Sequence, residues 1–284
     1  MKLVTYLAKG MPATGAVDAD GNVFDVSKIG DVMALMTSTS LRKAAKEHMT
    51  RKGAKPVGLV TKLKLRAPLI PGKIIAIGVN YAAHAAEMNR TELPTKPVVF
   101  AKMTNAISHP GDTVTWYADA TERMDWEAEL AVVIGKKAYR VSEADALKYV
   151  GGYTCANDLS AREIQQGDNG KQWVLGKSLD QSCPIGPALV TSDEIKDPQT
   201  LEIKCLVNGE VMQHSNTNTM LIGVARLIAH LTHYMTLYPG DMIVTGTPNG
   251  VGAGRNPPVF LKHGDEVVVE IEKIGTLRNK CAIK

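Results

Sequence analysis

The chain has 284 residues, of which 44% are hydrophobic, 22% are charged and 5% are aromatic, with 33 Lys and Arg residues against 29 Asp and Glu residues. This length and composition are typical of a folded, enzyme-sized protein with a sizeable core, and they exclude a disordered chain. The net charge of +4 is too small and too spread out to form a phosphate-binding stripe, and the aromatic residues are few and scattered, so nucleic acid is not an expected partner.

The first 68 residues are expected to form a small α+β domain that precedes a larger one. Its predicted elements are a strand at residues 2–8, a hairpin at residues 16–26 that turns at Asp20-Gly21, and a short basic helix at residues 41–49. The stretch at residues 62–72 contains two prolines, which is typical of a boundary. We therefore predict domains at residues 1–68 and 69–284.

The remainder of the chain is predicted to be rich in strands and poor in helices. Strands are expected at residues 73–79, 97–103, 125–134, 153–157, 188–191, 202–208, 242–245 and 266–271. Helices are expected at residues 81–88, at residues 220–237, and from Ser142 to the glycine pair at residues 151–152. The strand at residues 125–134 ends in an apolar run, which predicts burial on both faces. The fold class is therefore α+β and dominated by β-structure.

The four cysteines follow no metal-binding or disulfide pattern. They stand at positions 155, 183, 205 and 281, and three of them lie in or beside apolar stretches. Such thiols behave as small buried hydrophobes, which favours a reducing compartment, so we expect a cytoplasmic protein. The N-terminal apolar run is too short for a secretory signal, and the longest apolar helical stretch contains Arg226, so no membrane partner is expected.

Two acidic residues lead directly into the buried part of the strand at residues 125–134. Glu127 and Glu129 stand two apart, so both side chains point to the same face of a strand. An exposed edge strand would explain an isolated Glu-x-Glu pair. Here the strand continues into an apolar core, where carboxylates must be paired, protonated or bound to a metal, and no base stands at an alternating position.

A third carboxylate, Asp158, follows the strand predicted at residues 153–157. A strand–helix–strand arrangement allows the two strands to lie side by side, which brings Asp158 close to Glu127 and Glu129. Three carboxylates without a histidine or a thiol suit Mg²⁺ or Mn²⁺, with positions left for water or substrate. Asp158 can equally cap a following helix, and it can serve both purposes.

A histidine and a glutamate share one face of the helix predicted at residues 81–88. His84 and Glu87 are three residues apart, and a histidine oriented by a carboxylate is a general base that can activate water. An exposed polar pair is the plainer alternative. The surrounding alanines are small, however, so bulky packing does not explain why this helix is present.

Two further stretches contain groups that suit an anionic substrate. Lys177 lies in a Gly-Lys-Ser sequence without phosphate-loop spacing, and a lysine there can hold a substrate carboxylate or stabilise an enolate. The glycine-rich loop at residues 246–252 is not followed by a helical pattern, so it is not a dinucleotide site. Its amides and the Thr247 hydroxyl can bind an anion, and a simple turn explains the loop equally well.

Taken in order, these stretches resemble the fumarylacetoacetate hydrolase family over about residues 70–279. The motifs that carry the resemblance are GVNYAAHAAE at residues 78–87, DWEAELAVVIGK at 125–136, GYTCANDLSAR at 152–162, GKSLD at 176–180, PIGP at 184–187 and PGDMIVTGTP at 239–248. The bacterial branch of acylpyruvate hydrolases and ureidoglycolate-lyase-like proteins is the most similar one. The resemblance implies a mixed β-roll or sandwich catalytic domain behind a small N-terminal domain, and a homodimer.

The resemblance also implies roles for individual residues. It implies that Mg²⁺ or Mn²⁺ is held by Glu127, Glu129 and Asp158. It implies catalytic roles for His84 and Glu87, on a mobile lid, and for Lys177 in the substrate pocket. Substrate contacts are expected from Lys102 on the strand predicted at residues 97–103, from Arg162 and Gln165, and from Thr247. Asn80 stands where the founding enzyme has a further aspartate ligand, so three protein ligands are expected rather than four.

The leading functional hypothesis is a divalent-metal-dependent hydrolase that cleaves a carbon–carbon bond in a 2,4-dioxo acid such as an acylpyruvate, fumarylpyruvate or a diketo sugar acid. His84 would take a proton from water, hydroxide would attack C4, and the metal and Lys177 would stabilise the pyruvate-type enolate that leaves. The same site supports an oxaloacetate decarboxylase or an isomerase of the 2-hydroxyhepta-2,4-diene-1,7-dioate type. The alternative of another class is a non-catalytic metal- or ligand-binding protein, which has no use for His84 and Glu87.

Overall fold

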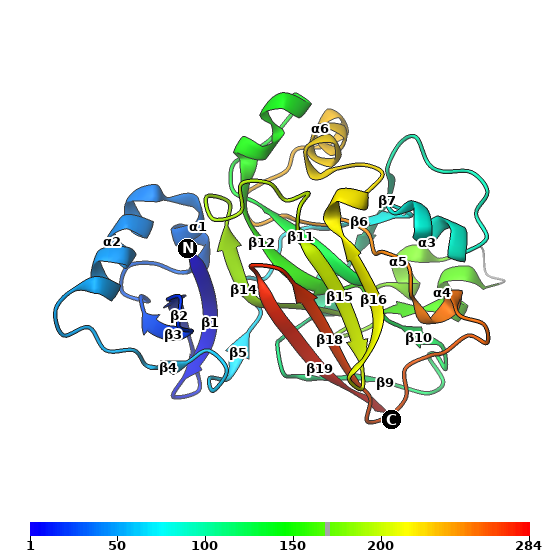
Figure 1. The fold of residues 1–284 in the computed structure, drawn as a ribbon, viewed down its shortest axis with the longest axis horizontal. Coiled ribbons are helices and arrows are strands. Elements are labelled where there is room, and N and C mark those ends of the chain that lie inside the picture. The colour runs from blue at the N-terminus through cyan, green and yellow to red at the C-terminus, as the bar shows by residue number, and fades with distance from the viewer. Residues whose placement is uncertain (168–170) are drawn as a thin grey trace.

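The computed structural model describes residues 1–167 and 171–284 of the chain, and strands dominate it (Figure 1). The strands form three sheets, of twelve, five and two strands. Within the described residues, the longest helix has 12 residues, and no helix is long and apolar enough to cross a membrane. The α+β, β-dominated fold class expected from the sequence is therefore confirmed.

The largest sheet contains most of the strands that lead to the candidate site. Its members are β1 (Lys2–Ala8), β2 (Met11–Val17), β3 (Asn22–Asp25), β4 (Gly58–Leu59), β5 (Leu65–Arg66), β6 (Ile74–Gly78), β7 (Val98–Lys102), β8 (Ile107–Ser108), β11 (Ala128–Ile134), β12 (Val150–Asn157), β14 (Cys183–Thr191) and β17 (Met242–Val244). The main path runs β4-β3-β2-β1-β14-β12-β11-β17-β6-β7, with β5 beside β1 and β8 beside β14. Strand β11 is buried along its whole length, as its apolar sequence predicts.

A second sheet packs against the middle of the first and encloses the main core (Figure 1). It contains β9 (Thr113–Trp116), β15 (Glu202–Val207), β16 (Glu210–Asn216), β18 (Glu266–Ile271) and β19 (Gly275–Ile283), in the order β16-β15-β18-β19-β9. Leu130 and Val132 of β11 lie in the same apolar cluster as Cys205 of β15 and Val269 of β18. Alternate residues of β11, such as Ala131, belong to a cluster on the opposite face of the large sheet.

Short helices and a two-stranded ribbon complete the fold. The ribbon pairs β10 (Met124–Asp125) with β13 (Ser160–Ala161). The α-helices are α1 (Val32–Thr37), α2 (Thr39–Thr50), α3 (Ala82–Glu87), α4 (Arg162–Gln166), α5 (Trp173–Gly176) and α6 (Val224–Tyr234), and 3₁₀ turns span Thr104–Ala106, Glu143–Tyr149, Thr217–Thr219 and Gly252–Gly254. Helices α3, α4 and α5 gather at the end of the molecule that lies opposite α1 and α2 (Figure 1).

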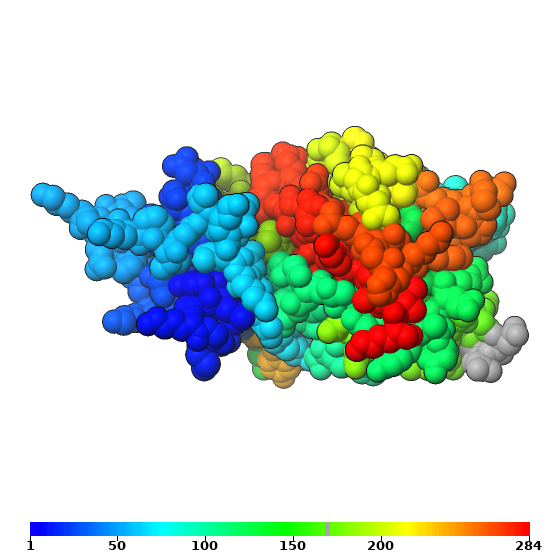
Figure 2. All heavy atoms as spheres, turned by 90° about the horizontal axis from the view of Figure 1, so that it is seen from below, coloured from blue at the N-terminus to red at the C-terminus, as the bar shows by residue number. Residues whose placement is uncertain are grey.

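The N-terminal part of the chain forms one end of the molecule, seen in blue at the left of Figure 2. Its hairpin of β2 and β3 and its basic helix α2 confirm those elements of the prediction. Strand β1 pairs with β14, with Lys2 opposite Val190, so the large sheet continues from the N-terminal part into the rest of the chain. The domain boundary at residues 62–72 stays a prediction.

The strand predicted at residues 125–134 is interrupted. Asp125 belongs to β10, and β11 begins only at Ala128. Between them, Trp126 N–H donates to the Asp125 side chain at 2.8 Å and Glu127 N–H donates to Asn157 Oδ1 at 3.1 Å. Because these amides bond to side chains rather than to a neighbouring strand, the chain leaves the sheet at Glu127.

Two predicted helices are shorter than their sequence patterns indicate. The helix expected from Ser142 is a 3₁₀ turn at Glu143–Tyr149, with Ser142 as its N-cap, and Gly151-Gly152 lies inside β12 instead of ending a helix. A Cβ on Gly151 would lie 2.5 Å from Met36 Sδ, so close packing explains this glycine. Helix α6 covers Val224–Tyr234 only, because Gly223 caps it and Met235 is extended.

The four cysteines are all free and buried, as the sequence predicts. Burial raises the pKa of the Cys183 thiol to about 12, so this side chain is neutral and unreactive at physiological pH. The cysteines therefore act as small core residues.

Candidate active site

Glu127, Glu129 and Asp158 converge at one end of β11 and β12, as predicted. One carboxylate oxygen of each residue lies within 4.8 Å of the other two, and all three side chains are buried. Strands β11 and β12 are antiparallel, with Ala128 opposite Asn157, so the start of one meets the end of the other. Glu127 and Asp158 flank this point of contact, and Asp158 N–H donates to the Glu127 carbonyl at 2.9 Å.

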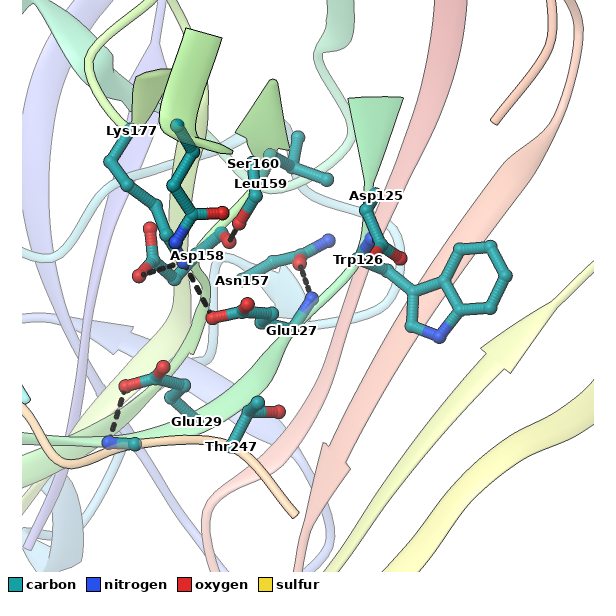
Figure 3. Close-up of polar contacts among 12 residues, drawn as sticks. Asp125, Trp126, Glu127, Glu129, Asn157, Asp158, Leu159, Ser160, Lys177 and Thr247 are labelled. Atoms are coloured by element: carbon teal, nitrogen blue, oxygen red, sulfur yellow. Dashed lines mark hydrogen bonds and ion pairs between the residues drawn. The ribbon is translucent and has the colours of Figure 1, made fainter. Parts of the chain in front are cut away.

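Lys177, the residue after α5, bonds to two of these carboxylates (Figure 3). Its Nζ donates to Glu127 Oε2 at 2.7 Å and to Asp158 Oδ2 at 3.0 Å. An ammonium group has three N–H donors, so one remains for a group in the adjoining cavity. Burial opposes the charge of Lys177, but Asp158 and Glu127 outweigh that effect and raise its pKa, so the side chain is a stable cation.

A second buried cation, Arg162 at the start of α4, binds the other oxygen of Glu127. Its Nη2 lies 2.8 Å from Glu127 Oε1 and 2.7 Å from Asp125 Oδ2, and its Nε donates to Asp125 Oδ2 at 2.8 Å. Its Nη1 donates to Gln165 Oε1 at 2.8 Å. Burial opposes the ionisation of Glu127, but Lys177 and Arg162 together hold its pKa at about 2, so this carboxylate is charged.

Glu129 has no ion-pair partner in the described part of the chain. Its Oε2 accepts a hydrogen bond from Gly246 N–H at 2.7 Å (Figure 3). Burial, together with the charges of Asp158 and Glu127, raises the pKa of Glu129 well above its ordinary value. A divalent cation among these oxygens would offset the repulsion between the neighbouring negative charges. Carboxylate oxygens are also ligands that Mg²⁺ and Mn²⁺ prefer. The cluster therefore fits such an ion in both donor chemistry and charge.

Lys102, at the end of β7, contacts the carboxylate cluster from outside the cavity. Its Nζ lies 2.7 Å from Asp158 Oδ1, donates to the Lys177 carbonyl, and lies 3.4 Å from the Leu159 carbonyl. The side chain is fully buried and is not among the residues that line the cavity. These contacts suit a residue that holds Asp158 and Lys177 in position, and its contact with substrate stays a prediction.

His84 and Glu87 form the pair that their spacing on α3 predicts. His84 Nδ1 lies 2.7 Å from Glu87 Oε1, and the histidine is buried. The second oxygen of Glu87 accepts a hydrogen bond from Gly250 N–H at 2.7 Å. Because Glu87 occupies Nδ1, the other ring nitrogen of His84, Nε2, is left for proton exchange.

A cavity of about 340 Å³ is lined by both His84 and Glu127, whereas Glu87, Glu129 and Asp158 are not among its lining residues. Six of the predicted site residues line it, namely His84, Glu127, Arg162, Gln165, Lys177 and Thr247. Apolar walls come from Ile77, Val79, Ala85, Met88, Phe100 and Trp173, and two further cations are Arg90 and Lys171. A concave, partly apolar space with a few convergent charged groups is typical of a site for a small organic ligand.

The loop after β17 supplies backbone donors to carboxylates of the chain itself. Three of these bonds, each of 2.7 Å, are Gly246 N–H to Glu129 Oε2, Gly250 N–H to Glu87 Oε2, and Gly252 N–H to Asp125 Oδ1. The loop therefore binds anions, which is one of the two interpretations of its sequence, but these anions are carboxylates of the chain itself. The loop connects the carboxylate cluster, the Asp125–Arg162 pair and the helix that carries His84.

Thr247 and Asn80 use their side chains to hold the site together. Thr247 Oγ1 donates to the Ala128 carbonyl at 2.9 Å and accepts from Gln213 Nε2 at 2.8 Å. Asn80 Nδ2 donates to the Thr245 carbonyl at 2.8 Å, and its Oδ1 accepts from Ile222 N–H at 2.9 Å. The amide oxygen of Asn80 is therefore engaged with the backbone, and the expectation of three protein ligands stays a prediction.

Three residues of the site have no role in the interpretation of the sequence. Asp125 orients Arg162, Gln213 holds Thr247 and donates to the Pro248 carbonyl at 2.7 Å, and Trp173 forms a wall of the cavity. Asp125 stands two residues before Glu127, in the same alternation as the two glutamates, and this spacing is the one local signal for it. Gln213 and Trp173 have no such signal.

Comparison with known proteins identifies relatives of this chain. The model of the fumarylacetoacetate (FAA) hydrolase C-terminal region matches residues 73–282. Oxaloacetate tautomerase FAHD2A, mitochondrial, from Bos taurus is 52% identical over 210 residues, which cover 74% of this chain and 66% of the bovine protein. The matched region thus spans slightly less than two thirds of that relative.

Solved structures extend the similarity to the whole chain. Fumarylacetoacetate hydrolase from Exiguobacterium antarcticum superimposes with a TM-score of 0.86 at 34% identity and covers 100% of both chains. Maleylpyruvate hydrolase from Sphingobium sp. SYK-6, in complex with manganese(II) and pyruvate, gives a TM-score of 0.82 at 30% identity, covering 100% of this chain and 99% of that one. The members of this group are enzymes, and the chain belongs to the fumarylacetoacetate hydrolase family.

Proposed function

We propose that the protein is a Mg²⁺- or Mn²⁺-dependent enzyme that moves a proton at the carbon beside the carbonyl of a 2-oxo acid, and that its reaction is the keto–enol tautomerisation of oxaloacetate. The observation that carries the proposal is that His84, which pairs with Glu87, lines the same cavity as Glu127 and Lys177. The bovine relative is named an oxaloacetate tautomerase, which supports the choice of substrate.

Electrostatics at the inner end of the cavity favour an anionic ligand once a divalent ion is present. Four buried acids, Asp125, Glu127, Glu129 and Asp158, stand beside three buried bases, Lys102, Arg162 and Lys177. Glu127, Glu129 and Asp158 would hold the divalent ion, which would supply positive charge for the binding of an anionic 2-oxo acid. The cluster then has one excess positive charge, which matches one carboxylate head.

The proton transfer itself falls to residues of the chain. His84 Nε2 takes a proton from C3, the C–H electron pair forms the C2–C3 double bond, and negative charge moves to the 2-oxygen. Glu87 keeps the imidazole oriented and stabilises its cationic form. The free N–H of Lys177 stabilises the enolate oxygen, and return of the proton from His84 Nε2 to that oxygen completes the tautomerisation and restores the neutral imidazole.

Hydrolysis of an acylpyruvate is the second candidate, and one observation favours it specifically. The Sphingobium neighbour is named a maleylpyruvate hydrolase, and its structure contains pyruvate and manganese. The His84–Glu87 pair can equally take a proton from water, as the leading sequence-based hypothesis requires. Decarboxylation of oxaloacetate and isomerisation of an unsaturated diacid remain variants of the same enolate chemistry.

One set of assays separates these reactions. The ultraviolet absorbance of enol-oxaloacetate should decay faster with the Mg²⁺-loaded protein than without it, and His84→Gln should remove the acceleration. Pyruvate release, measured in parallel, reports decarboxylation of oxaloacetate and hydrolysis of acylpyruvates. Tautomerisation without pyruvate release supports the proposal. Pyruvate release from an acylpyruvate with no effect on the enol signal overturns it in favour of the hydrolase, and metal binding without any turnover favours a non-catalytic protein.

We further propose a homodimer in a reducing compartment. Strand β7 is the last strand of the large sheet, and Val99 on it and Met103 after it are 40% and 52% exposed, a surface that a second copy would cover. The free buried thiols suit the cytoplasm, whereas the bovine relative is named as mitochondrial, which is also a reducing environment. Light scattering tests the dimer, and a monomer would contradict it.

A further inference from the structure

We propose that Gln213 is a positioning residue of the active site, whose side-chain amide fixes the carboxylate cluster and the His84 base relative to each other. Gln213 lies on β16, in the second sheet, and its side chain is buried. It is not among the residues that line the cavity, so it acts through other groups. The inference rests on the proposed function, because it assumes that the cluster binds the metal ion and that His84 is the base.

On the side of β11 that faces β17, the strand pairing stops before β11 begins. The pairing of β17 with β11 runs from Ala131 to Val133, and Thr245 N–H donates to the Leu130 carbonyl at 3.1 Å just beyond it. The backbone N–H and carbonyl of Ala128 point to the same side, because Ala128 stands two residues before Leu130. There the chain continues as the loop after β17 rather than as a strand, so side chains must satisfy these buried backbone groups.

Gln213 and Thr247 close a ring of hydrogen bonds with Ala128. Gln213 Oε1 accepts from Ala128 N–H at 2.9 Å, Gln213 Nε2 donates to Thr247 Oγ1 at 2.8 Å, and Thr247 Oγ1 donates to the Ala128 carbonyl at 2.9 Å. Gln213 Nε2 also donates to the Pro248 carbonyl at 2.7 Å. Because a backbone N–H can only donate and a carbonyl can only accept, the position requires both the oxygen and the NH₂ group of an amide.

Ala128 connects this ring to the metal-binding acids. It stands between Glu127 and Glu129, whose carboxylates converge with that of Asp158. Since its N–H and its carbonyl are both held, the two glutamates that flank it start from fixed backbone positions. Loss of the Gln213 amide would leave the buried N–H of Ala128 without an acceptor. We therefore expect Gln213 to influence metal affinity without contacting the ion.

The loop after β17 connects the same amide to the base. Gln213 binds this loop at two consecutive residues, and Gly250, two residues further on, donates its N–H to Glu87 Oε2 at 2.7 Å. Gly250 has no room for a Cβ beside the Met212 carbonyl oxygen, so the loop packs directly on β16. Because Glu87 orients His84, the position of the base depends on where this loop is held.

Two substitutions separate the two links. Gln213→Met approximately keeps the size of the side chain and removes its hydrogen bonds, so both links are lost. Gln213→Glu keeps an oxygen that accepts from Ala128 N–H but, as a carboxylate, cannot donate to Thr247 or Pro248, so the link to the loop is lost selectively. Calorimetric titration of the metal-free full chain gives the Kd for Mn²⁺, and the decay of enol-oxaloacetate at saturating Mn²⁺ gives kcat.

For Gln213→Met we expect the Kd for Mn²⁺ to rise and kcat to fall, each by about ten- to a hundredfold, as is usual for residues that orient metal ligands. For Gln213→Glu we expect a loss of about ten- to a hundredfold in kcat, because the base is misplaced, with a smaller change in the Kd for Mn²⁺ than in Gln213→Met. In Glu87→Ala the loop no longer reaches the helix, so adding Gln213→Glu should cause little further loss of kcat.

Gln199→Met is the matched control for a purely structural effect. The Gln199 amide likewise accepts from a backbone N–H, that of Val224 at 2.8 Å, and donates to a backbone carbonyl, that of Thr217 at 2.7 Å. These partners belong neither to the carboxylate cluster nor to the loop after β17. Gln199→Met should lower the melting temperature and leave the Kd for Mn²⁺ and kcat unchanged. The same result for Gln213→Met would overturn the positioning role.

The other failures are distinguishable. Equal losses of kcat from Gln213→Glu with and without Glu87 would overturn the link to the base, and the proposal with it. This comparison does not use Gln213→Met, so a folding defect in that variant does not leave the question open. Oxalate is an inert analogue of the 2-oxo acid head, and failure of the unmodified protein to bind oxalate with Mn²⁺ would overturn the proposed function and therefore the inference.

Discussion

The Glu87 carboxylate bonds Gly250 N–H at 2.7 Å, across 163 positions of sequence, while its other oxygen bonds His84 Nδ1 at 2.7 Å. One side chain thus attaches helix α3, which carries the proposed general base, to the loop after β17. The same loop bonds Glu129 through Gly246 N–H. The position of His84 is therefore tied to the carboxylate cluster through the Glu87 side chain and the main chain of one loop.

Replacement of the proposed base should suppress turnover without unfolding the protein. For His84→Gln we expect kcat to fall by roughly 10²- to 10⁴-fold, the usual contribution of a positioned general base. The melting temperature and the Kd for Mn²⁺ should stay unchanged. His214→Gln is the control, because His214 also pairs with a glutamate, Glu202 at 2.6 Å, but on the exposed surface. Retention of full activity by His84→Gln would exclude it as the base.

A methyl group added next to the hydrogen bond between Glu87 and the loop should also reduce activity. A Cβ on Gly254 would lie 2.9 Å from Glu87 Oε2, so Gly254→Ala must displace the carboxylate and with it His84. Because small misplacements of reacting groups can cost on the order of 10²-fold in rate, we expect a loss of about ten- to a hundredfold in kcat with a nearly unchanged Kd for oxalate. Steady-state kinetics and calorimetry measure the two quantities. A wild-type kcat in this variant would show that turnover does not depend on the position of the Glu87 carboxylate.

Loss of Asp125 should destabilise the protein more than loss of a surface acid. Asp125→Asn leaves the buried Arg162 without its main partner, and breaking one member of a buried ion pair costs about 3–5 kcal/mol. Urea unfolding monitored by fluorescence gives the free energy of unfolding. Asp145→Asn removes an exposed pair with Lys148 and should have no measurable effect. Equal effects of the two substitutions would contradict the role of Asp125.

Metal binding should weaken as the pH falls. In the metal-free protein the pKa of Glu129 is raised above its ordinary value of 4.5, so the folded chain keeps a proton there that the unfolded chain has already lost. Stability from this group is present below pH 4.5 and is lost as the pH rises through the raised pKa. A divalent ion must displace the proton, so the increase in melting temperature with Mn²⁺ should be larger at about pH 8 than at about pH 5.

Glu129→Gln isolates this effect, because the amide carries no titratable proton. Its melting temperature should show a smaller response to Mn²⁺, and the remaining response should depend less on pH. Scanning calorimetry across the pH range, with and without Mn²⁺, provides both values. A response to Mn²⁺ that is independent of pH in the unmodified protein would show that Glu129 does not lose a proton on binding.

Local sequence patterns were sufficient to find the groups that stand close together in the chain. Three-residue spacing on a helix brings His84 next to Glu87, and the Glu-x-Glu pair at the start of a buried strand indicates acids that need a cation. The antiparallel pairing of β11 and β12 then brings Asp158 into the cluster, since the chain turns back after a short 3₁₀ segment. These contacts depend on secondary structure and strand adjacency alone.

Lys177 and Arg162 are both predicted as site residues, but their ion pairs with the acids of the site could not be predicted in this way. Lys177 bonds Glu127 across 50 positions, and Arg162 bonds Asp125 across 37, so no period of a helix or strand relates them. The apolar pattern also extended the strand at residues 125–134 through Glu127, because hydrophobicity does not reveal that side chains of Asp125 and Asn157 accept the backbone amides. Both the ion pairs of the two cations and the interruption of the strand depend on side-chain contacts that the apolar pattern does not encode.

The pairing of β1 with β14 has a consequence for how the protein folds. A chain cut after residue 68 would leave β14 with an open edge of unpaired amides and carbonyls, and such edges pair with other molecules. We therefore expect the N-terminal part to protect the large sheet from aggregation in addition to occupying one end of it. Because both parts share one hydrogen-bonded ladder, we expect them to unfold in a single cooperative transition.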